Sequence, residues 1–363
     1  MADTVFLEQG RDARPSERSL RFAAECSAPV HLVISRGGTG LAQALVRLVR
    51  AHPGTVYLLD LNVTTGLPAL LYTRLSRTPL VLDFGDEVGA VSWNMGRWWL
   101  VCVMQGFLQR IAVRSADHVV VRSRMHAWLL RRRGASNVVV IEDGVDLARF
   151  PYRGRATKRA RARLGFPEEG WILGVVGSLN YGARSRYVYG LEIVHALACL
   201  RDLTTYGLIV GSGSGLAVLR REATRLRVAD RIAFVPFVKG KNIPLLLSCA
   251  QGWLWVQSHD AVGRVRTSGK LPLYLAGARR ILGSRTGASL STFARGRDLI
   301  LKTRALDPAA IGAEVAGELR GRFLAEKADE NEPRASASRF DYAALARRWR
   351  GFMETWGYGE ALR

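Results

Sequence analysis

The chain has 363 residues, of which 48% are hydrophobic and 23% are charged, so it is long and apolar enough to fold into two domains of ordinary size. Its 53 lysines and arginines outnumber its 31 acidic residues, which gives a net charge of +22. Only six of the basic residues are lysines. This arginine excess reflects either a GC-rich genome or a polyanionic partner: nucleic acid, an anionic membrane or a phosphorylated ligand.

Several classes of protein do not fit this sequence. The four cysteines are widely spaced and form no CxxC pair, which argues against zinc ribbons and disulfide scaffolds. The polar, mixed-charge start does not resemble a secretory signal. The apolar run 98–108 is about half as long as the roughly 20 residues of a spanning helix. We therefore expect a cytoplasmic protein, whose only membrane contact would be peripheral, at the inner face.

In chain order, residues 1–20 read as a loose arm and residues 21–150 as a first α/β domain. Strands are expected where β-branched or apolar runs occur, at 30–35, 56–63, 79–87, 117–123 and 137–146. Helical spacing of apolar residues predicts helices between them, at 41–52, 66–76, 95–115 and 125–134. Near-continuous apolar strands alternating with helices indicate a parallel sheet that is covered on both faces.

The pattern restarts after a basic, turn-rich linker at 151–170. In a second domain, 171–325, strands are expected at 171–179, 205–213, 231–238, 252–258 and 279–284. Helices are expected between them, at 186–200, 215–228, 242–249 and 268–277. Residues 326–363 read as a linker and a C-terminal helix that packs back. The fold class is therefore α/β, with two tandem Rossmann-like, doubly wound domains and a ligand cleft between them.

An ordered set of short patterns runs through both domains. They are GVD at 144–146, GSL at 177–179, LIVGSGSG at 208–215, VQSHD at 256–260 and SGKLPLYLAGARRIL at 268–282. In this order and at these separations the chain resembles the family-four retaining glycosyltransferases of the GT-B fold, over roughly residues 75–310. The resemblance implies a nucleotide-sugar donor, with UDP or GDP as the nucleotide, held mainly by the second domain.

Two glycine-rich loops are candidates for the donor phosphates. Gly211 and Gly213 end the second strand of the second domain, and Gly37 and Gly38 follow the strand at 30–35. Glycines let backbone amides approach a phosphate closely. They serve equally well to make a tight turn between a strand and a helix, and both interpretations stay open at this point.

Cations for the donor diphosphate are expected near two loops. The family commonly has an Arg where Ser178 stands here, and Arg184 and Arg186 are the nearest replacements. Any single arginine of this chain is as readily a surface residue.

The SGK element is the second place to look. Ser268, Gly269 and Lys270 open a helix in the family, and Arg264 and Arg266 lie just upstream on a loop expected to face the cleft. Lys270 is the main candidate for stabilising the leaving diphosphate.

Carboxylates fit the family less closely. Asp260 loosely matches an acidic position near the transferred sugar, but Leu273 stands where the family commonly has the Glu that binds the ribose. In the first domain, Asp86 is the candidate that orients the acceptor hydroxyl, with a helix N-cap as its alternative. We therefore name Asp86, Lys270 and Asp260 as candidate catalytic residues. The resemblance implies no metal and no cofactor, and the histidines show no metal-binding spacing.

The acceptor is open. The apolar region 94–114 would suit an interfacial helix on an anionic membrane, which favours a lipid-linked glycan; its all-round apolarity also fits a buried helix. The basic runs 131–134 and 152–163 would suit a nucleic-acid acceptor, as in phage DNA glycosylation. A small soluble acceptor is the third alternative. Given Leu273 and Ser178, a non-catalytic GT-B binding protein is a fourth.

Overall fold

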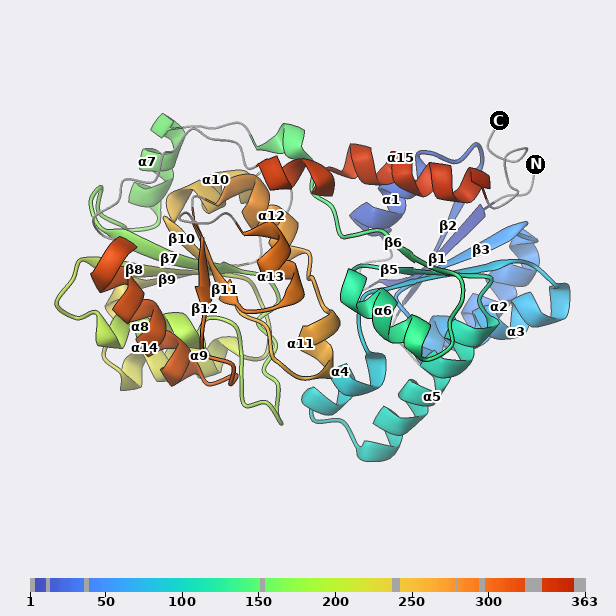
Figure 1. Cartoon of the computed structure of the whole chain (residues 1–363), viewed down its shortest axis with the longest axis horizontal. Coiled ribbons are helices and arrows are strands. Elements are labelled where there is room, and N and C mark those ends of the chain that lie inside the picture. Colours follow the sequence, from blue (N-terminus) through green and yellow to red (C-terminus); the bar gives the residue numbers. More distant parts are fainter. Residues whose placement is uncertain are drawn as a thin grey trace.

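The two halves of the chain form two α/β domains, each built on one six-stranded parallel sheet (Figure 1). The structure is a computed structural model, and it describes residues 4–10, 14–35, 39–150, 154–236, 242–278, 280–293, 298–323 and 335–355. The predicted fold class, two tandem Rossmann-like domains, is confirmed. Ligands of such folds bind beyond the carboxyl ends of the strands.

The first sheet has the strand order β2-β1-β3-β4-β5-β6. Its strands are β1 Thr4–Gly10, β2 Pro29–Ser35, β3 Thr55–Leu59, β4 Leu80–Phe84, β5 His118–Val121 and β6 Val138–Val140. Every residue of β3 and β4 is buried, as expected for central strands with helices on both faces. The helices are α1 Glu17–Ala23, α2 Gly40–Ala51, α3 Val63–Ser76, α4 Val88–Asn94, α5 Trp99–Ser115 and α6 Arg124–Arg132, with a 3₁₀ turn, η1, at Leu147–Arg149.

The second sheet has the order β12-β11-β10-β7-β8-β9. Its strands are β7 Trp171–Val176, β8 Thr205–Val210, β9 Ile232–Val235, β10 Gly252–Trp255, β11 Arg280–Ser284 and β12 Leu299–Leu301. Its helices are α7 Gly154–Arg163, α8 Leu191–Cys199, α9 Leu216–Arg225, α10 Ile243–Cys249, α11 Ala261–Val265, α12 Lys270–Gly277, α13 Gly287–Thr292 and α14 Pro308–Glu318. The short turns η2 Ala229–Arg231 and η4 Leu319–Phe323 follow α9 and α14.

The expected loose arm at residues 1–20 is wrong for the part that the structure describes. Residues 4–10 form β1, which pairs with β2 on one side and β3 on the other, and Val5, Phe6 and Leu7 have no exposed surface. Three apolar residues between polar neighbours are too short a run to signal a strand. The strand is stabilised by the tertiary pairing on both its edges.

The expected linker at 151–170 is also wrong over its described part. Residues 154–163 form α7, whose Ala160 is buried in the same core cluster as Phe166 and Leu247 of the second domain. Lys158, Arg159 and Arg163 are exposed on this helix, whereas Arg161 is buried and donates to the carbonyl of Gly170 (2.8 Å).

The apolar segment after β4 forms two helices, and the second of them is exposed. Trp98 retains 62% of its accessible surface and Phe107 63%, and the side chains of Trp99, Val103 and Met104 are exposed as well. One face of α5 is buried, through Cys102, Leu108, Gln109 and Ala112, so the alternative of a helix buried on all sides is wrong only for the opposite face. Helix α5 lies along the lower edge of the first domain, with α4 near the second domain (Figure 1).

The C-terminal segment returns to the first domain. A 3₁₀ segment, η5 (Ala335–Phe340), packs on α12 of the second domain, and α15 (Tyr342–Met353) then packs on α1 of the first (Figure 1). Trp349 of α15 stacks on Phe22 with ring centroids 5.4 Å apart. The segment therefore bridges the two domains.

Among the described residues, no helix has both the length and the apolar character needed to cross a bilayer. All four cysteines are free thiols.

Candidate functional site

Asp86 and Arg266 join the two domains inside the cleft. Asp86 follows β4 of the first domain, and Arg266 lies on the loop between α11 and α12 of the second. The guanidinium group donates two hydrogen bonds to the carboxylate, at 2.7 Å from Nε to Oδ1 and 2.6 Å from Nη2 to Oδ2. Burial opposes both charges, but the mutual hydrogen bonds prevail, so the pKa of Asp86 is lowered and that of Arg266 is raised.

This geometry bears on the expected role of Asp86. Glu87, not Asp86, is the N-cap residue of α4, so the capping alternative for Asp86 is wrong. The carboxylate lies at the cleft as expected, and in this arrangement it is neutralised by Arg266.

The amine of Lys270 is buried in the same cleft. Lys270 begins α12, and its Nζ lies 3.0 Å from the centroid of the Tyr189 ring. It has no hydrogen-bond partner among the described residues. Burial, reinforced by the nearby charge of Arg266, lowers the pKa of Lys270 to about 7, against the opposing effect of Glu192. Gly177 makes room for the side chain, because a Cβ there would lie 2.5 Å from the Lys270 Cε.

A buried carboxylate completes the group of side chains around Lys270. Glu192, in the first turn of α8, accepts hydrogen bonds through Oε2 from the Tyr187 hydroxyl (2.8 Å) and the Gly190 amide (3.0 Å). Its Oε1 has no partner within the described structure. Burial raises the pKa of Glu192. We did not single out Glu192 or Tyr189 from the sequence. The available signal was that Glu192 is the only acidic residue of the predicted helix 186–200.

The glycine-rich loop of the second domain packs tightly against the loop that contains Ser178. A Cβ on Gly211 would lie 2.0 Å from the carbonyl oxygen of Gly177, and one on Gly213 would lie 2.4 Å from the carbonyl carbon of Leu179. The amide of Leu179 donates to the carbonyl of Ser212 (3.1 Å). Close packing of two loops therefore accounts for both glycines, and contact with phosphate stays a prediction. Gly37 and Gly38 lie outside the described residues.

Arg184 links the domains and does not face Lys270. Its guanidinium stacks on Trp93 of α4, 3.6 Å from the ring centroid, and donates to the carbonyls of Trp93 and Arg97 (2.9 and 2.8 Å). Arg186 is exposed and adopts a left-handed backbone with φ 50°. For neither residue does the structure show a position beside the Lys270 amine.

Asp260 and its neighbours hold α11 in place. Its Oδ1 accepts from the amides of Val262 and Gly263 (2.9 and 3.0 Å), and its Oδ2 accepts from Asn94 of the first domain (2.7 Å). These hydrogen bonds lower the pKa of Asp260 despite burial. The side chain therefore acts as an N-cap and an interdomain contact, and its predicted place beside the transferred sugar remains untested.

The remaining predicted residues surround the start of α12. Arg264 donates to the carbonyl of His259 (2.9 Å), and Ser268 accepts from the Trp255 indole (3.2 Å). Gly269 is the N-cap residue of α12. Leu273 packs against the apolar core of the second domain, so it brings no hydrogen-bond acceptor to the cleft.

A second polar network lies at the carboxyl ends of the first sheet. Asp83 is fully buried and accepts hydrogen bonds from Arg18 Nε (2.7 Å) and the Tyr57 hydroxyl (2.8 Å). Arg122 follows β5 and is paired with Asp60 at 2.6 Å. This network fixes the ends of β3, β4 and β5 in the first domain, and our sequence analysis missed it because its members lie far apart in the chain.

The arrangement offers two cations, Lys270 and Arg266, at the carboxyl ends of the second sheet. One is unpartnered and the other is held by a carboxylate of the opposite domain. Among the described residues, no cluster of His, Cys, Asp and Glu has a geometry that would hold a metal ion. The site is therefore suited to binding an anion through side-chain cations.

Comparison with known proteins places this geometry in a class. No protein-family model matches the chain. D-inositol 3-phosphate glycosyltransferase of Salinispora arenicola is 35% identical over 156 residues, which cover 38% of this chain and 34% of the relative. The chain thus matches about a third of the length of that curated relative.

Two solved structures superimpose on nearly the whole chain. HepE of Anabaena, in complex with UDP and glucose, superimposes with a TM-score of 0.74 at 15% identity and covers 98% of this chain and 100% of its own. The lipopolysaccharide outer core galactosyltransferase WaaB superimposes with a TM-score of 0.60 at 11% identity, covering 98% and 99%.

The chain is therefore a protein of the GT-B class, with two Rossmann-like domains and a cleft between them. Over about a third of that relative's length, it is similar in sequence to the D-inositol 3-phosphate glycosyltransferase.

The buried amine of Lys270 predicts a pH-dependent affinity for UDP. A bound diphosphate favours the charged amine and raises its pKa above the value of about 7 in the free protein. Affinity should therefore lose the contribution of Lys270 above about pH 7, by up to about tenfold per pH unit. Calorimetric titration with UDP from about pH 6 to about pH 9 measures this, with Lys270→Ala as the reference that lacks the effect and Lys302→Ala as an exposed-lysine control. Identical pH profiles for wild type and Lys270→Ala would contradict the assignment.

The ion pair predicts opposite effects for its two partners. Asp86→Asn keeps the side-chain shape but releases Arg266, so UDP should bind about two- to fivefold more tightly, since a partly exposed ion pair contributes roughly 1 kcal/mol or less. Arg266→Gln should weaken UDP binding. Both constants come from the same titration. If Asp86→Asn weakens UDP binding as much as Arg266→Gln does, the carboxylate of Asp86 does not compete with UDP for Arg266.

Proposed function

We propose that this chain is a retaining hexosyltransferase that moves a sugar from a UDP- or GDP-sugar to a hydroxyl of a membrane- or lipid-linked glycan. The nucleotide-sugar donor in this proposal is supported by the buried amine of Lys270 between the domains, which has no hydrogen-bond partner among the described residues. The similarity to a structure holding UDP and glucose supports a nucleotide-sugar in that position.

In this proposal Lys270 and Arg266 bind the donor diphosphate. As the bond between the sugar C1 and the diphosphate breaks, negative charge grows on the leaving phosphate, and the two cations bound to the diphosphate stabilise that charge. The acceptor oxygen forms the new bond to C1 on the same face, and its proton passes to the leaving phosphate. Asp86 lies on the opposite wall, where it would orient the acceptor hydroxyl once Arg266 turns to the diphosphate.

Leu273 affects the nucleotide end of the donor. A leucine cannot accept hydrogen bonds from ribose hydroxyls, and its side chain packs into the core. Ribose recognition therefore contributes less here, and donor affinity rests more on the diphosphate. Glu192, whose Oε1 lacks a partner within the described structure, is the carboxylate whose charge acts on Lys270.

The exposed apolar face of α3, α4 and α5 supports the membrane-linked acceptor. We call it the α5 face, and its members are Leu67, Leu71, Leu75, Trp93, Met95, Trp98, Trp99, Val103, Met104, Phe107 and Ile111. A groove of about 830 Å³ runs between α3 and α5 within it. A patch of this size exceeds the scattered apolar side chains of ordinary soluble surfaces.

Charge around the α5 face favours an anionic bilayer over a second copy of the chain. The segments 61–82 and 88–116 contain five arginines and no acidic residue. Those arginines are Arg74, Arg77, Arg97, Arg110 and Arg114, and all five are exposed. Two such surfaces would repel one another, whereas acidic lipid headgroups would attract either of them.

The α5 face also lies next to the cleft. Trp93 at the end of α4 carries the stacked guanidinium of Arg184, and Asn94 bonds Asp260 across the domains. A bilayer in contact with α5 would therefore present a lipid-linked acceptor at the mouth of the cleft.

The nucleic-acid alternative draws less support from the structure. In the run 131–134, Arg131 donates to the carbonyl of Val138, Arg133 pairs with Glu87 at 2.9 Å, and Arg132 stacks on Trp128. These guanidinium groups already have intramolecular partners, so they offer little to a phosphate backbone.

Transfer itself is tested with a donor panel. Purified chain is incubated with UDP-glucose, UDP-galactose or GDP-mannose and a membrane lipid extract, and transfer is followed by radiolabel in the lipid fraction. We expect transfer from one donor and a loss of roughly hundredfold in Lys270→Ala, because the leaving group loses a fixed cation. Lys302→Ala is the matched control. Binding of UDP without transfer or hydrolysis from any donor would identify a non-catalytic GT-B protein.

The α5 face is tested by co-sedimentation with vesicles. Wild-type protein should bind vesicles containing anionic lipid and bind neutral vesicles weakly. Trp98→Ser with Phe107→Ser should reduce that binding by at least about tenfold, because two large apolar side chains no longer enter the interface. Leu290→Ser is the control, since Leu290 is a comparably exposed apolar residue on α13. Equal binding by the double variant and the control would remove the membrane from the proposal.

A further inference from the structure

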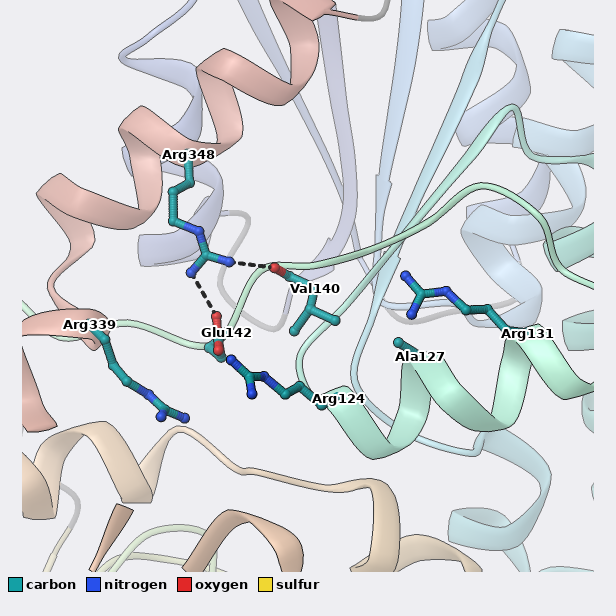
Figure 2. A pocket seen from close by; sticks show the side chains of 7 residues that line it. All are labelled: Arg124, Ala127, Arg131, Val140, Glu142, Arg339 and Arg348. Atoms are coloured by element: carbon teal, nitrogen blue, oxygen red, sulfur yellow. Dashed lines mark hydrogen bonds and ion pairs between the residues drawn. The ribbon is translucent and has the colours of Figure 1, made fainter. Parts of the chain in front are cut away.

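A pocket lined with arginines lies between α6, β6 and the C-terminal segment (Figure 2). Its volume is about 480 Å³. It is lined by Arg124, Ala127, Arg131, Val140, Glu142, Arg339 and Arg348. None of these residues belongs to the donor site around Lys270.

Two of the four arginines have structural partners. β6 is the edge strand of the first sheet, so its outer carbonyls lack a neighbouring strand. Arg131 donates to the carbonyl of Val138 (2.6 Å) and Arg348 to that of Val140 (2.9 Å). Arg348 also pairs with Glu142 at 3.0 Å, as the dashed lines of Figure 2 show. The edge strand explains both residues.

Arg124 and Arg339 have no such role. No hydrogen bond or ion pair holds either guanidinium group within the described structure, although Arg339 also stacks on its neighbour Phe340. They come from different segments, the start of α6 and η5, and both reach toward the space beside Glu142 (Figure 2). Burial lowers the pKa of Arg339, the carboxylate of Glu142 opposes this effect, and the charges of Arg124 and Arg348 add to it.

The pocket therefore gathers four positive charges against the single carboxylate of Glu142. Such a cluster is unfavourable by itself, and it becomes favourable when an anion with several charges fills it. Paired guanidinium groups match phosphate oxygens in geometry as well as in charge. A cavity of this volume takes a ligand larger than one phosphate ion.

We propose that this pocket is a second anion site, which binds a soluble phosphorylated small molecule, such as a sugar bisphosphate or a diphosphate, through Arg124 and Arg339. The source is soluble and not a lipid headgroup, because the pocket lies between α6 and α15 while the α5 face lies on the lower edge of the domain (Figure 1). A bilayer in contact with that face leaves the pocket open to solvent.

The site is placed to communicate with the donor cleft. Arg339 lies on η5, whose Ala337 and Phe340 share a core cluster with Leu271 and Tyr274 of α12. Lys270 is the first residue of α12. An anion that fixes η5 would therefore act on the helix that presents the donor-site cation.

The test measures binding of pyrophosphate and of fructose 1,6-bisphosphate to the full chain by calorimetry, with the donor site saturated by UDP. Arg124→Gln with Arg339→Gln should weaken this binding by at least about tenfold, because two charge-assisted contacts are lost. The same variant should fold, since neither side chain holds a backbone group, and it should keep the rise in Tm on adding UDP. Arg163→Gln with Arg304→Gln is the control with the same change in charge.

Three outcomes would overturn the proposal. The first is unchanged binding in the Arg124, Arg339 variant. The second is an equal loss in the Arg163, Arg304 control, which would indicate a general charge effect. In the third, neither soluble probe binds and the Arg124, Arg339 variant instead loses binding to vesicles with phosphatidic acid, which would move the phosphate source to a lipid. Because the donor site is read separately through UDP, failure here leaves the proposed glycosyltransfer standing, and the reverse also holds.

Discussion

The cleft depends on a charge balance across the two domains, centred on the bidentate pair of Asp86 and Arg266. Polar groups lie at the carboxyl ends of the strands in parallel α/β domains. Their hydrogen-bond and charge partners come from the opposite domain or from a ligand. Arg266 is satisfied by the first domain, whereas the amine of Lys270 contacts the face of Tyr189 and has no hydrogen-bond partner among the described residues. The cost of burying this unpartnered cation explains its lowered pKa and marks the position that a diphosphate would fill.

Interdomain contacts around this pair are few and polar. Arg184 stacks on Trp93, Asn94 bonds Asp260, and the Ser123 hydroxyl donates to the Val265 carbonyl. The Thr267 hydroxyl likewise donates to the Arg122 carbonyl, so polar groups of both domains are satisfied by one another at this interface. The apolar link between the domains is instead the C-terminal segment, in which η5 packs on one domain and α15 on the other.

The sequence predicted the fold well where strands were long and apolar and failed where tertiary pairing decides. Strand β1 was missed because Val5, Phe6 and Leu7 form a run of three, which only pairing with β2 and β3 stabilises. Of the predicted site residues, Asp86 and Arg266 form an ion pair between the domains, and the charge of Arg266 acts on Lys270. Arg184 instead bonds Trp93 and Arg97, which lie far away in sequence, so the local sequence carries no signal for these partners. Asp260 caps α11 through its sequence neighbours and bonds the distant Asn94.

The net charge of +22 says less about the partners of the protein than do the arginines that have no role within the fold. Many arginines have partners within the fold. Arg18 pairs with Asp83, and Arg131 and Arg348 donate hydrogen bonds to carbonyls of the edge strand β6. The remaining arginines fall into two groups, which differ in the shape of the surface around them. The arginines around α5 lie on an open apolar surface, which suits the two-dimensional charge of a bilayer, whereas Arg124 and Arg339 converge in a cavity, which suits a compact anion. In our two proposals the same residue type would bind different partners, because the shape of the surface selects the ligand as much as charge does.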